Sequence, residues 1–401
     1  DGKDHQSCQF LSKRAPDESH EFTWKEVTTT RGGELAEILG DQLRSVDSLV
    51  VKGNVNDKDF HAMWDASLYG YLSVINLKNA VLENNAVPDT AFFHENEQYE
   101  GSSHEIFYYI GLRKIIFPEG LEKIGEGAFY QASALRQVNF PSTLRYIGDF
   151  AFNATKLEMN QLVIPEGVEE INQYAFAFCR KLKAQVTLPS TIKKIGEWAF
   201  YACPITSINL PEGLESLGSL AFWDCDLREV SIPSSCHEFN EGWQFGFNRN
   251  LEKMHLPEGM TEIPDHFAVD CFRLREVNFP HTLKHIGEKA FSLCISLKNV
   301  DLPLGMQSLG EEAFSELEAL EQIVFPASMK SLGKNSCSYW KNIKRIYCAA
   351  MEPPVCDPTD GGVFSGFDFP DGFDTPVVYI PKGSINKYKD TSRNCMGWEK
   401  F

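Results

Sequence analysis

The 401 residues carry a formal net charge of −18 at pH 7, and 43% of them are hydrophobic. This hydrophobic content excludes a mostly disordered chain, and the acidic excess makes nucleic acids and anionic membranes unfavourable partners. No apolar run reaches the roughly 20 residues of a membrane-spanning helix, so no transmembrane segment is predicted. The charged first residues predict that this chain carries no signal peptide; a cytoplasmic protein and a mature exported protein both remain open.

The N-terminal part predicts a leader followed by a cap. Residues 1–30 offer little to pack and are expected to be a poorly ordered leader. Leu35, Ile38, Leu39 and Leu43 follow at helical spacing, residues 48–51 predict a strand, and Asp57 begins a capped helix. Residues 31–116 are therefore assigned to an N-terminal cap with the first irregular coils, interrupted by a polar loop at 94–107.

From residue 117 to residue 348 the chain repeats itself. Prolines recur every 22 to 24 residues, at positions 118, 141, 165, 189, 211, 233, 257, 280, 303 and 326. A fixed period of this length indicates a solenoid, in which each unit buries its apolar face against its neighbours. The array therefore predicts ten repeats in one elongated body, closed by a C-terminal cap at 349–401.

Each repeat predicts one short strand, a turn and a buried ring. Leu135, Val138 and Phe140 alternate with polar residues, as in a strand with one buried face, and Pro141 ends the strand. An Ala-Phe pair recurs on the turn side, and its stacked rings should form a phenylalanine spine. The pairs begin at Ala128, Ala151, Ala175, Ala199, Ala221, Ala290 and Ala313.

A longer period is superimposed on the repeat. Pro-Glu-Gly at 118, 165, 211 and 257 alternates with Pro-Ser-Thr or a similar triplet. The pattern predicts that the array grew by copying a pair of repeats, and we assign it no chemical role.

These motifs resemble the BspA-type leucine-rich repeat family of bacterial surface proteins. The family unit is matched at Leu188-Pro189, Ile192, Ile195-Gly196, Ala199-Phe200 and Cys203. The resemblance implies an α/β right-handed leucine-rich-repeat solenoid with one strand per coil and turns or short helices opposite. It also implies export, often as a lipid-anchored surface protein, and binding of host matrix proteins in some members. Cys8 lies inside this chain and not at its first position.

Cysteines, histidines and acidic residues predict neither a metal nor a catalytic site. Most register cysteines fall three residues after the repeat's Phe, where other repeats hold Ala, so we expect buried free thiols. Cys348 and Cys356 could form a disulfide, and Asp368, Asp371 and Asp374 could bind calcium, although a solvated acidic turn is the simpler reading. Neither a catalytic motif nor a cofactor fingerprint is present, which predicts a non-enzymatic protein without a cofactor.

Two surfaces are candidates for partner binding. The first is the exposed face of the strands, rich in uncharged amides and hydroxyls that bind without desolvating charge; its residues are Gln137, Asn139, Gln161, Gln185, Thr187, Ser207, Asn209 and Glu229. The second is an aromatic stripe on the turn side, formed by Phe150, Tyr174, Trp198, Tyr201, Trp223 and Trp243. A solvated sheet with amide ladders and packing between coils are the respective alternatives.

These observations together favour a monomeric, non-catalytic interaction protein, secreted or on a cell surface. We expect it to bind a protein partner, a host matrix protein among the candidates, through the sheet face or the stripe. The alternative is a glycan-binding module that stacks sugar rings on the region around Trp198 and Trp223.

Overall fold

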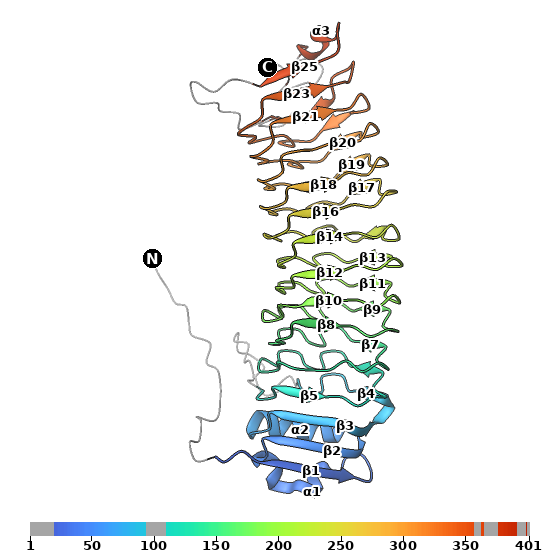
Figure 1. The fold of residues 1–401 in the computed structure, drawn as a ribbon, viewed down its shortest axis with the longest axis vertical. Helices are drawn as coiled ribbons and strands as arrows, with labels where there is room; N and C mark the ends of the chain where they lie inside the picture. The colour runs from blue at the N-terminus through green and yellow to red at the C-terminus, as the bar shows by residue number, and fades with distance from the viewer. Residues whose placement is uncertain (1–19, 94–109, 357–361, 365–375, 391–397, 399–401) are drawn as a thin grey trace, which may run out of the picture. The chain divides into compact units, whose positions relative to one another are not determined.

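The computed structural model describes residues 20–93, 110–356, 362–364, 376–390 and 398. The chain falls into two compact units, Asp1–Ile192 and Lys193–Phe401, and each is a parallel-strand solenoid with few helices (Figure 1). The expected solenoid fold is thus confirmed. The loop at 94–107, the Asp368, Asp371 and Asp374 turn and much of the C-terminal cap lie outside the described residues.

The first unit contains most of the helices and all of the longer strands. Its strands are β1 (Trp24–Thr29), β2 (Ser48–Val55), β3 (Val74–Leu82), β4 (Ala86–Val87), β5 (Lys114–Ile116), β6 (Lys123–Ile124), β7 (Tyr146–Ile147), β8 (Gln161–Val163), β9 (Glu170–Ile171) and β10 (Gln185–Thr187). Its helices are α1 (Leu35–Leu39), the 3-10 helix η1 (Gly40–Ser45), α2 (Asp57–Tyr69) and the 3-10 turn η2 (Glu83–Asn85). Its sheets pair in the orders β1-β2-β3-β5, β4-β6-β7 and β8-β10.

The second unit is built almost entirely of short strands. They are β11 (Lys194–Ile195), β12 (Ser207–Asn209), β13 (Ser216–Leu217), β14 (Glu229–Ser231), β15 (Glu238–Phe239), β16 (Lys253–His255), β17 (Glu262–Ile263), β18 (Glu276–Asn278), β19 (His285–Ile286), β20 (Ser308–Leu309), β21 (Gln322–Phe325), β22 (Ser331–Leu332), β23 (Arg345–Cys348), β24 (Val355–Cys356) and β25 (Val377–Tyr379), followed by helix α3 (Ile385–Tyr388). Its sheets pair in the orders β11-β13-β15, β14-β16-β18, β17-β19-β20-β22-β24 and β21-β23-β25.

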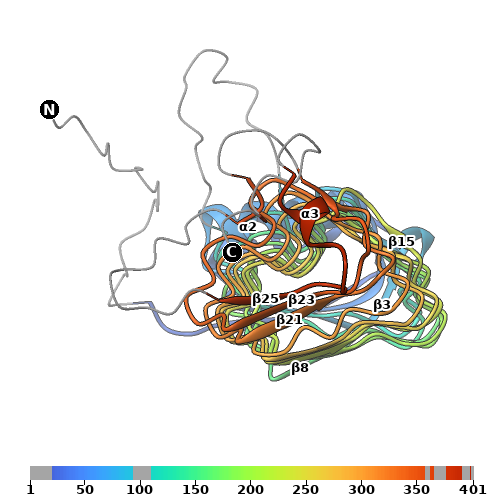
Figure 2. The same ribbon diagram turned by 90° about the horizontal axis from the view of Figure 1, so that it is seen from above.

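Most repeats contain a two-residue strand as well as the expected strand. The two kinds of strand lie on different sides of each coil's cross-section (Figure 2). The second strand ends at the apolar residue that precedes the glycine of the Ile-Gly motif, as in β19 and β20, where Ile286 and Leu309 pair in register. The sequence pattern here is too short to show alternation, so only the stacking of coils defines this sheet.

Residues 24–29, which the sequence placed in the leader, form β1 instead. They pair with β2 in parallel register, from Trp24 opposite Ser48 to Thr29 opposite Gly53. Only Val27 and Thr29 of the six side chains are buried. The strand is therefore held largely by backbone hydrogen bonds, which leave no hydrophobic period in the sequence.

The predicted helices form with different boundaries. The helix expected at 34–43 is α1 followed by the 3-10 helix η1, and Ile38 is 50% exposed although it has helical spacing. The second helix is capped by Asn56 and not by Asp57; the Asn56 side chain and Asp59 form a capping box. Asp59 also accepts the backbone N–H of Leu35 at 2.9 Å, which ties the start of α1 to α2.

The phenylalanine spine is present in both units. In the first unit Phe129, Phe152 and Phe176 stack with centroid distances of 5.3 and 5.4 Å and nearly parallel planes. In the second unit Phe222 stacks in the same way between Phe200 and Phe245, at 5.6 and 5.5 Å. All of these rings are fully buried. The repeated Ala-Phe pair therefore defines the hydrophobic core.

The two-repeat period has a chemical basis that the sequence analysis did not assign. The Thr191 hydroxyl, in a Pro-Ser-Thr triplet, accepts the N–H of Gly167 (2.9 Å) and donates to the carbonyl of Val168 (2.8 Å), at the preceding Pro-Glu-Gly turn. Ser190 donates to Glu166 of the same turn. Gly167 has φ +96°, a conformation that favours glycine. The same bridges join Thr143 to Gly120, Ser235 to Gly213 and Thr282 to Gly259. Each Pro-Glu-Gly turn is thus hydrogen-bonded to the hydroxyl of the triplet in the next coil, and this pairing explains why the two kinds of triplet alternate.

Candidate binding surfaces

The predicted sheet face is solvent-accessible. Seven of its eight residues are exposed, and Asn139 is half-buried. In the first unit Gln161 and Gln185 stand opposite each other in register on β8 and β10, and Val163 stands opposite Thr187. The face therefore offers amide and hydroxyl groups in rows along the stacked coils.

Asn139 has a structural role that removes it from the list of free amides. The N–H of Phe117 donates to Asn139 Oδ1 (2.7 Å), and Asn139 Nδ2 donates to the carbonyl of Phe117 (3.2 Å). Asn278 makes the same pair of bonds to the backbone of Leu256 in the second unit. Each amide substitutes for a peptide group of the ladder, as the amide-ladder alternative anticipated. Both hydrogen-bonding atoms of Asn139 are therefore already engaged.

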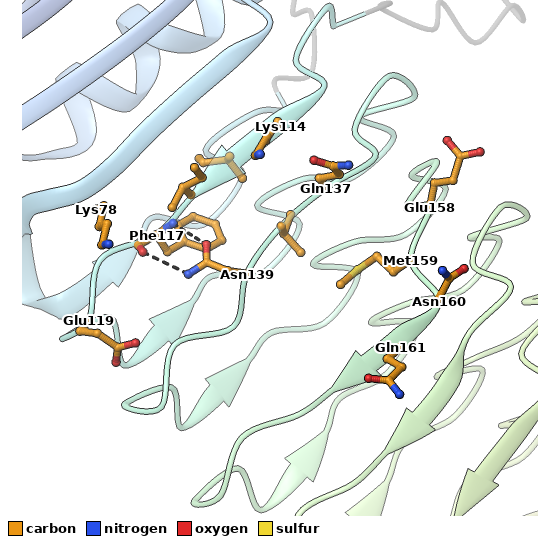
Figure 3. Close-up of a pocket in the computed structure, with 13 residues that line it drawn as sticks. Lys78, Lys114, Phe117, Glu119, Gln137, Asn139, Glu158, Met159, Asn160 and Gln161 are labelled. Atoms are coloured by element: carbon orange, nitrogen blue, oxygen red, sulfur yellow. Dashed lines mark hydrogen bonds between the residues drawn. The ribbon is translucent and has the colours of Figure 1, made fainter.

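A hollow of about 790 Å³ opens on the sheet face of the first unit (Figure 3). Gln137 and Asn139 belong to one coil, and Met159 and Gln161 belong to the next (Figure 3). The lining residues are Lys78, Lys114, Ile115, Ile116, Phe117, Glu119, Gln137, Val138, Asn139, Glu158, Met159, Asn160 and Gln161. This volume suits a bound segment of peptide or a small ligand.

An interruption of the parallel ladder accompanies the hollow. The coil that follows β5 pairs with it through the single bridge between Lys114 and Gln137 and forms no strand. β8 is consequently the end strand of its sheet. Asn160 accepts the N–H of Gln185 at 3.0 Å, so the backbone groups of Gln161 point to the opposite edge, toward the hollow.

Of the charged residues that line the hollow, the two acidic ones have polar partners within the protein, and the two lysines form no ion pair with the described residues. Glu158 pairs with Arg136 at 2.7 Å, and Glu119 accepts a hydrogen bond from the Ser142 hydroxyl at 3.0 Å. Within the described residues neither Lys78 nor Lys114 forms an ion pair. Lys114 is half-buried and Lys78 is exposed. The sequence analysis missed both lysines, because they lie before the regular repeats and only the fold brings β3 and β5 beside the first regular coils.

All six residues of the aromatic stripe are half-buried. In the first unit Phe150 and Tyr174 stack at 4.7 Å with planes 7° apart. In the second unit Trp198 contacts Tyr201 at 4.4 Å, and Trp223 contacts Trp243 at 5.2 Å. The rings thus pack against one another and leave part of each surface accessible, which combines the two alternatives considered for the stripe.

Trp223 has a specific packing partner in the backbone. A Cβ added to Gly246 would lie 2.1 Å from a ring atom of Trp223, so the indole rests directly on that glycine. Phe247 contacts the other part of the indole at 4.5 Å. The coil at 236–256, where Gln244-Phe245 stands in place of the Ala-Phe pair, therefore accommodates Trp223 through its glycine. We expect loss of Trp223 to affect stability as well as any binding.

The position that carries the stripe has an unusual backbone. Phe150, Tyr174, Trp198 and Trp243 have φ between 55° and 66°, in the left-handed region. In the Phe150 coil, alternate N–H groups of residues 150, 152 and 154 donate to carbonyls of residues 173, 175 and 177 at 2.8 to 3.0 Å. These bonds offset the cost of about 1–2 kcal/mol that a side chain incurs in this conformation. These four residues of the stripe therefore lie in turns whose backbone conformation is held by hydrogen bonds between coils.

The nine cysteines within the described residues are buried, and no disulfide joins Cys348 to Cys356. Their slot is not purely apolar, because the thiols of Cys179, Cys225 and Cys271 donate to the carbonyl of a Phe in the preceding coil. Thr155, at the same repeat position, donates to the carbonyl of Phe152 in its own coil. Burial raises the pKa of Cys271 and of Cys236 to about 12. The slot thus takes a small residue, and Cys adds a weak hydrogen-bond donor there.

Metal ligands and membrane spans are not found in the described part of the chain. No group of three or more His, Cys, Asp or Glu residues there could hold a metal ion. No helix there is long and apolar enough to span a bilayer. His266 stacks on Trp243 at 3.6 Å, and burial lowers its pKa below the usual range.

A repeated coil of this kind, with its Pro turn, Ile-Gly strand, Ala-Phe core and Cys slot, defines a leucine-rich-repeat solenoid. The family model of the BspA type leucine rich repeat region matches this chain at residues 102–186, 183–292 and 266–351, in six copies. The matched residues cover more than half of the chain. The chain therefore belongs to the BspA-type leucine-rich repeat family.

Solved structures with similar folds come from several bacteria. A leucine-rich repeat protein of Bacteroides ovatus is 23% identical, with a TM-score of 0.47 over 70% of this chain and 79% of that chain. A leucine-rich cell surface protein of Faecalibacterium prausnitzii is 21% identical, with a TM-score of 0.37 over 66% and 82%. The pneumococcal vaccine antigen PcpA is 18% identical, with a TM-score of 0.39 over 87% and 77%. The search of curated proteins found no match.

Proposed function

We propose that this protein is a non-catalytic interaction protein, secreted or on a cell surface, that binds a protein partner through the sheet face of its first unit. The observation that carries the proposal is the hollow of about 790 Å³ on the predicted face, with the exposed amides of Gln137 and Gln161 in its lining. Membership of a repeat family typical of surface and interaction proteins supports it. Host matrix proteins are the first partners to test.

The test compares blocked and unblocked sheet faces. Purified host matrix proteins are immobilised, and binding of the wild-type chain is measured by biolayer interferometry. The double variant Gln137→Arg/Gln161→Arg places two long charged side chains in the hollow. It should weaken binding by at least about 2 kcal/mol, as expected for residues at the centre of an interface. Gln42→Arg, at an exposed amide of η1, is the matched control and should bind like the wild type.

A partner whose binding is unchanged in the double variant would contradict the assignment to this face. Turnover of a substrate by the intact chain would contradict the non-catalytic assignment. Circular dichroism of each variant confirms that the solenoid is retained.

The second candidate function is glycan binding at the aromatic stripe. The paired rings of Trp198 and Tyr201 are half-buried and lie 4.4 Å apart, so part of each remains available to an apolar sugar face. A glycan array probed with the wild type and with Trp198→Ala tests this candidate. A glycan that binds the wild type and not the variant favours it over the sheet face.

A further inference from the structure

We propose that the hollow between β3 and β8 binds an extended segment of a partner protein and pairs carboxylates of that segment with Lys78 and Lys114, which lie about four residues apart along the paired strands β3 and β5. This inference rests on the proposed function and adds the chemistry of the partner. It assigns roles to two lysines and to the open edge of β8, none of which the sequence analysis had selected.

The charge distribution selects an anion. The chain has a net charge of −18, and several of its exposed cations are already paired, as in Lys52–Glu26, Arg136–Glu158 and Lys253–Glu276. Lys78 and Lys114 have no ion-pair partner among the described residues. Lys114 is half-buried, and a cation in this position gains more from a ligand carboxylate than a fully exposed cation does.

The acidic residues of the hollow do not cancel this preference. Glu158 is paired with Arg136, and Glu119 accepts a hydrogen bond from the Ser142 hydroxyl. Both carboxylates are therefore partly satisfied within the protein. Lys78 and Lys114 also lie toward the β3 and β5 end of the hollow, away from Glu158 (Figure 3). A carboxylate bound at Lys114 is distant from both acidic side chains, and one bound at Lys78 lies beside Glu119, whose carboxylate is hydrogen-bonded to Ser142 (Figure 3).

The remaining lining fits a peptide better than a sugar acid. Ile116, Val138 and Met159 provide apolar surface for side chains. The outward backbone groups of Gln161, on the end strand β8, provide a donor and an acceptor for a peptide backbone. Peptide recognition at sheet edges combines these same elements: main-chain hydrogen bonds supply affinity and side-chain pockets supply specificity.

The experiment uses an array of random hexapeptides, each printed in a Glu version and in a matched Gln version. The full-length wild-type chain should prefer the Glu versions. The double variant Lys78→Gln/Lys114→Gln should lose this preference, with a rise in Kd of about tenfold for the best Glu peptide, as expected for two partly exposed ion pairs. Lys181→Gln/Lys183→Gln, which removes two exposed lysines of the same unit outside the hollow, should behave like the wild type.

Three results would overturn the proposal. They are equal binding of Glu and Gln peptides, a Glu preference that survives in Lys78→Gln/Lys114→Gln, and lysine-dependent binding of uronic-acid oligosaccharides in place of peptides. None of these affects the matrix-protein assay with Gln137→Arg/Gln161→Arg. Failure of the carboxylate assignment is therefore distinguishable from failure of the proposed function.

Discussion

Replacement of Phe222 by alanine tests whether the stacked rings support the fold. Phe222 is fully buried and stacks between Phe200 at 5.6 Å and Phe245 at 5.5 Å, with planes within 10° of parallel. Truncation of a buried Phe costs about 3–5 kcal/mol because transfer free energy is lost and a cavity is left. Two aromatic contacts are also lost, each worth about 0.5–1.5 kcal/mol beyond burial. We therefore expect the upper half of that range, about 4–5 kcal/mol.

The free energy of unfolding is measured by urea titration, followed by both far-UV circular dichroism and tryptophan fluorescence. Leu304→Ala is the control, because Leu304 is apolar but 89% exposed and should change stability by less than about 0.5 kcal/mol. A loss below about 1 kcal/mol for Phe222→Ala would refute the reasoning, since it would place the ring outside a close-packed core.

Three further outcomes follow from the structure. The buried thiols of Cys236 and Cys271, with pKa values of about 12, should not react with Ellman's reagent at pH 8 and should react fully after unfolding without reductant; thiols still blocked after unfolding would contradict free cysteines. Thr191→Val should cost about 1–2 kcal/mol in urea titration, because the hydroxyl that bridges the Gly167 turn is removed, and an unchanged midpoint would count against the bridge. The Glu34 carboxylate accepts two backbone N–H groups, which lower its pKa to about 2. Its contribution to stability is therefore present above the ordinary pKa of a glutamate and is lost as the pH falls toward 2. An NMR titration midpoint near 4.5 would contradict this.

The repeat explains why so much of the fold could be predicted. The proline period and the Ala-Phe pair each recur at one structural position, so a single local interpretation applies to every coil. Phe152 and Phe222 are buried as this interpretation requires. The exposure of Gln161 and Gln185 also follows from the alternation of a strand, since neighbours of buried residues point outward.

Contacts between coils could not be predicted in the same way. The bond from Thr191 to Gly167 joins residues 24 positions apart, and each triplet alone is an ordinary turn sequence. Asn139 looks like any exposed amide until the backbone of Phe117 is placed beside it. Such hydrogen bonds depend on register, which local sequence does not state.

The sequence by itself determined the solenoid, its core and the direction in which the strand residues face, because these depend on patterns within one repeat. Only the tertiary structure decided where the sheet face is hollowed. The hollow exists because the coil around Gln137 leaves the ladder before β8, and its cations come from β3 and β5. Lys78 and Gln161 are 83 positions apart in the sequence and share one cavity. Their proximity is set by the stacking of coils, a long-range property that no window of local sequence contains.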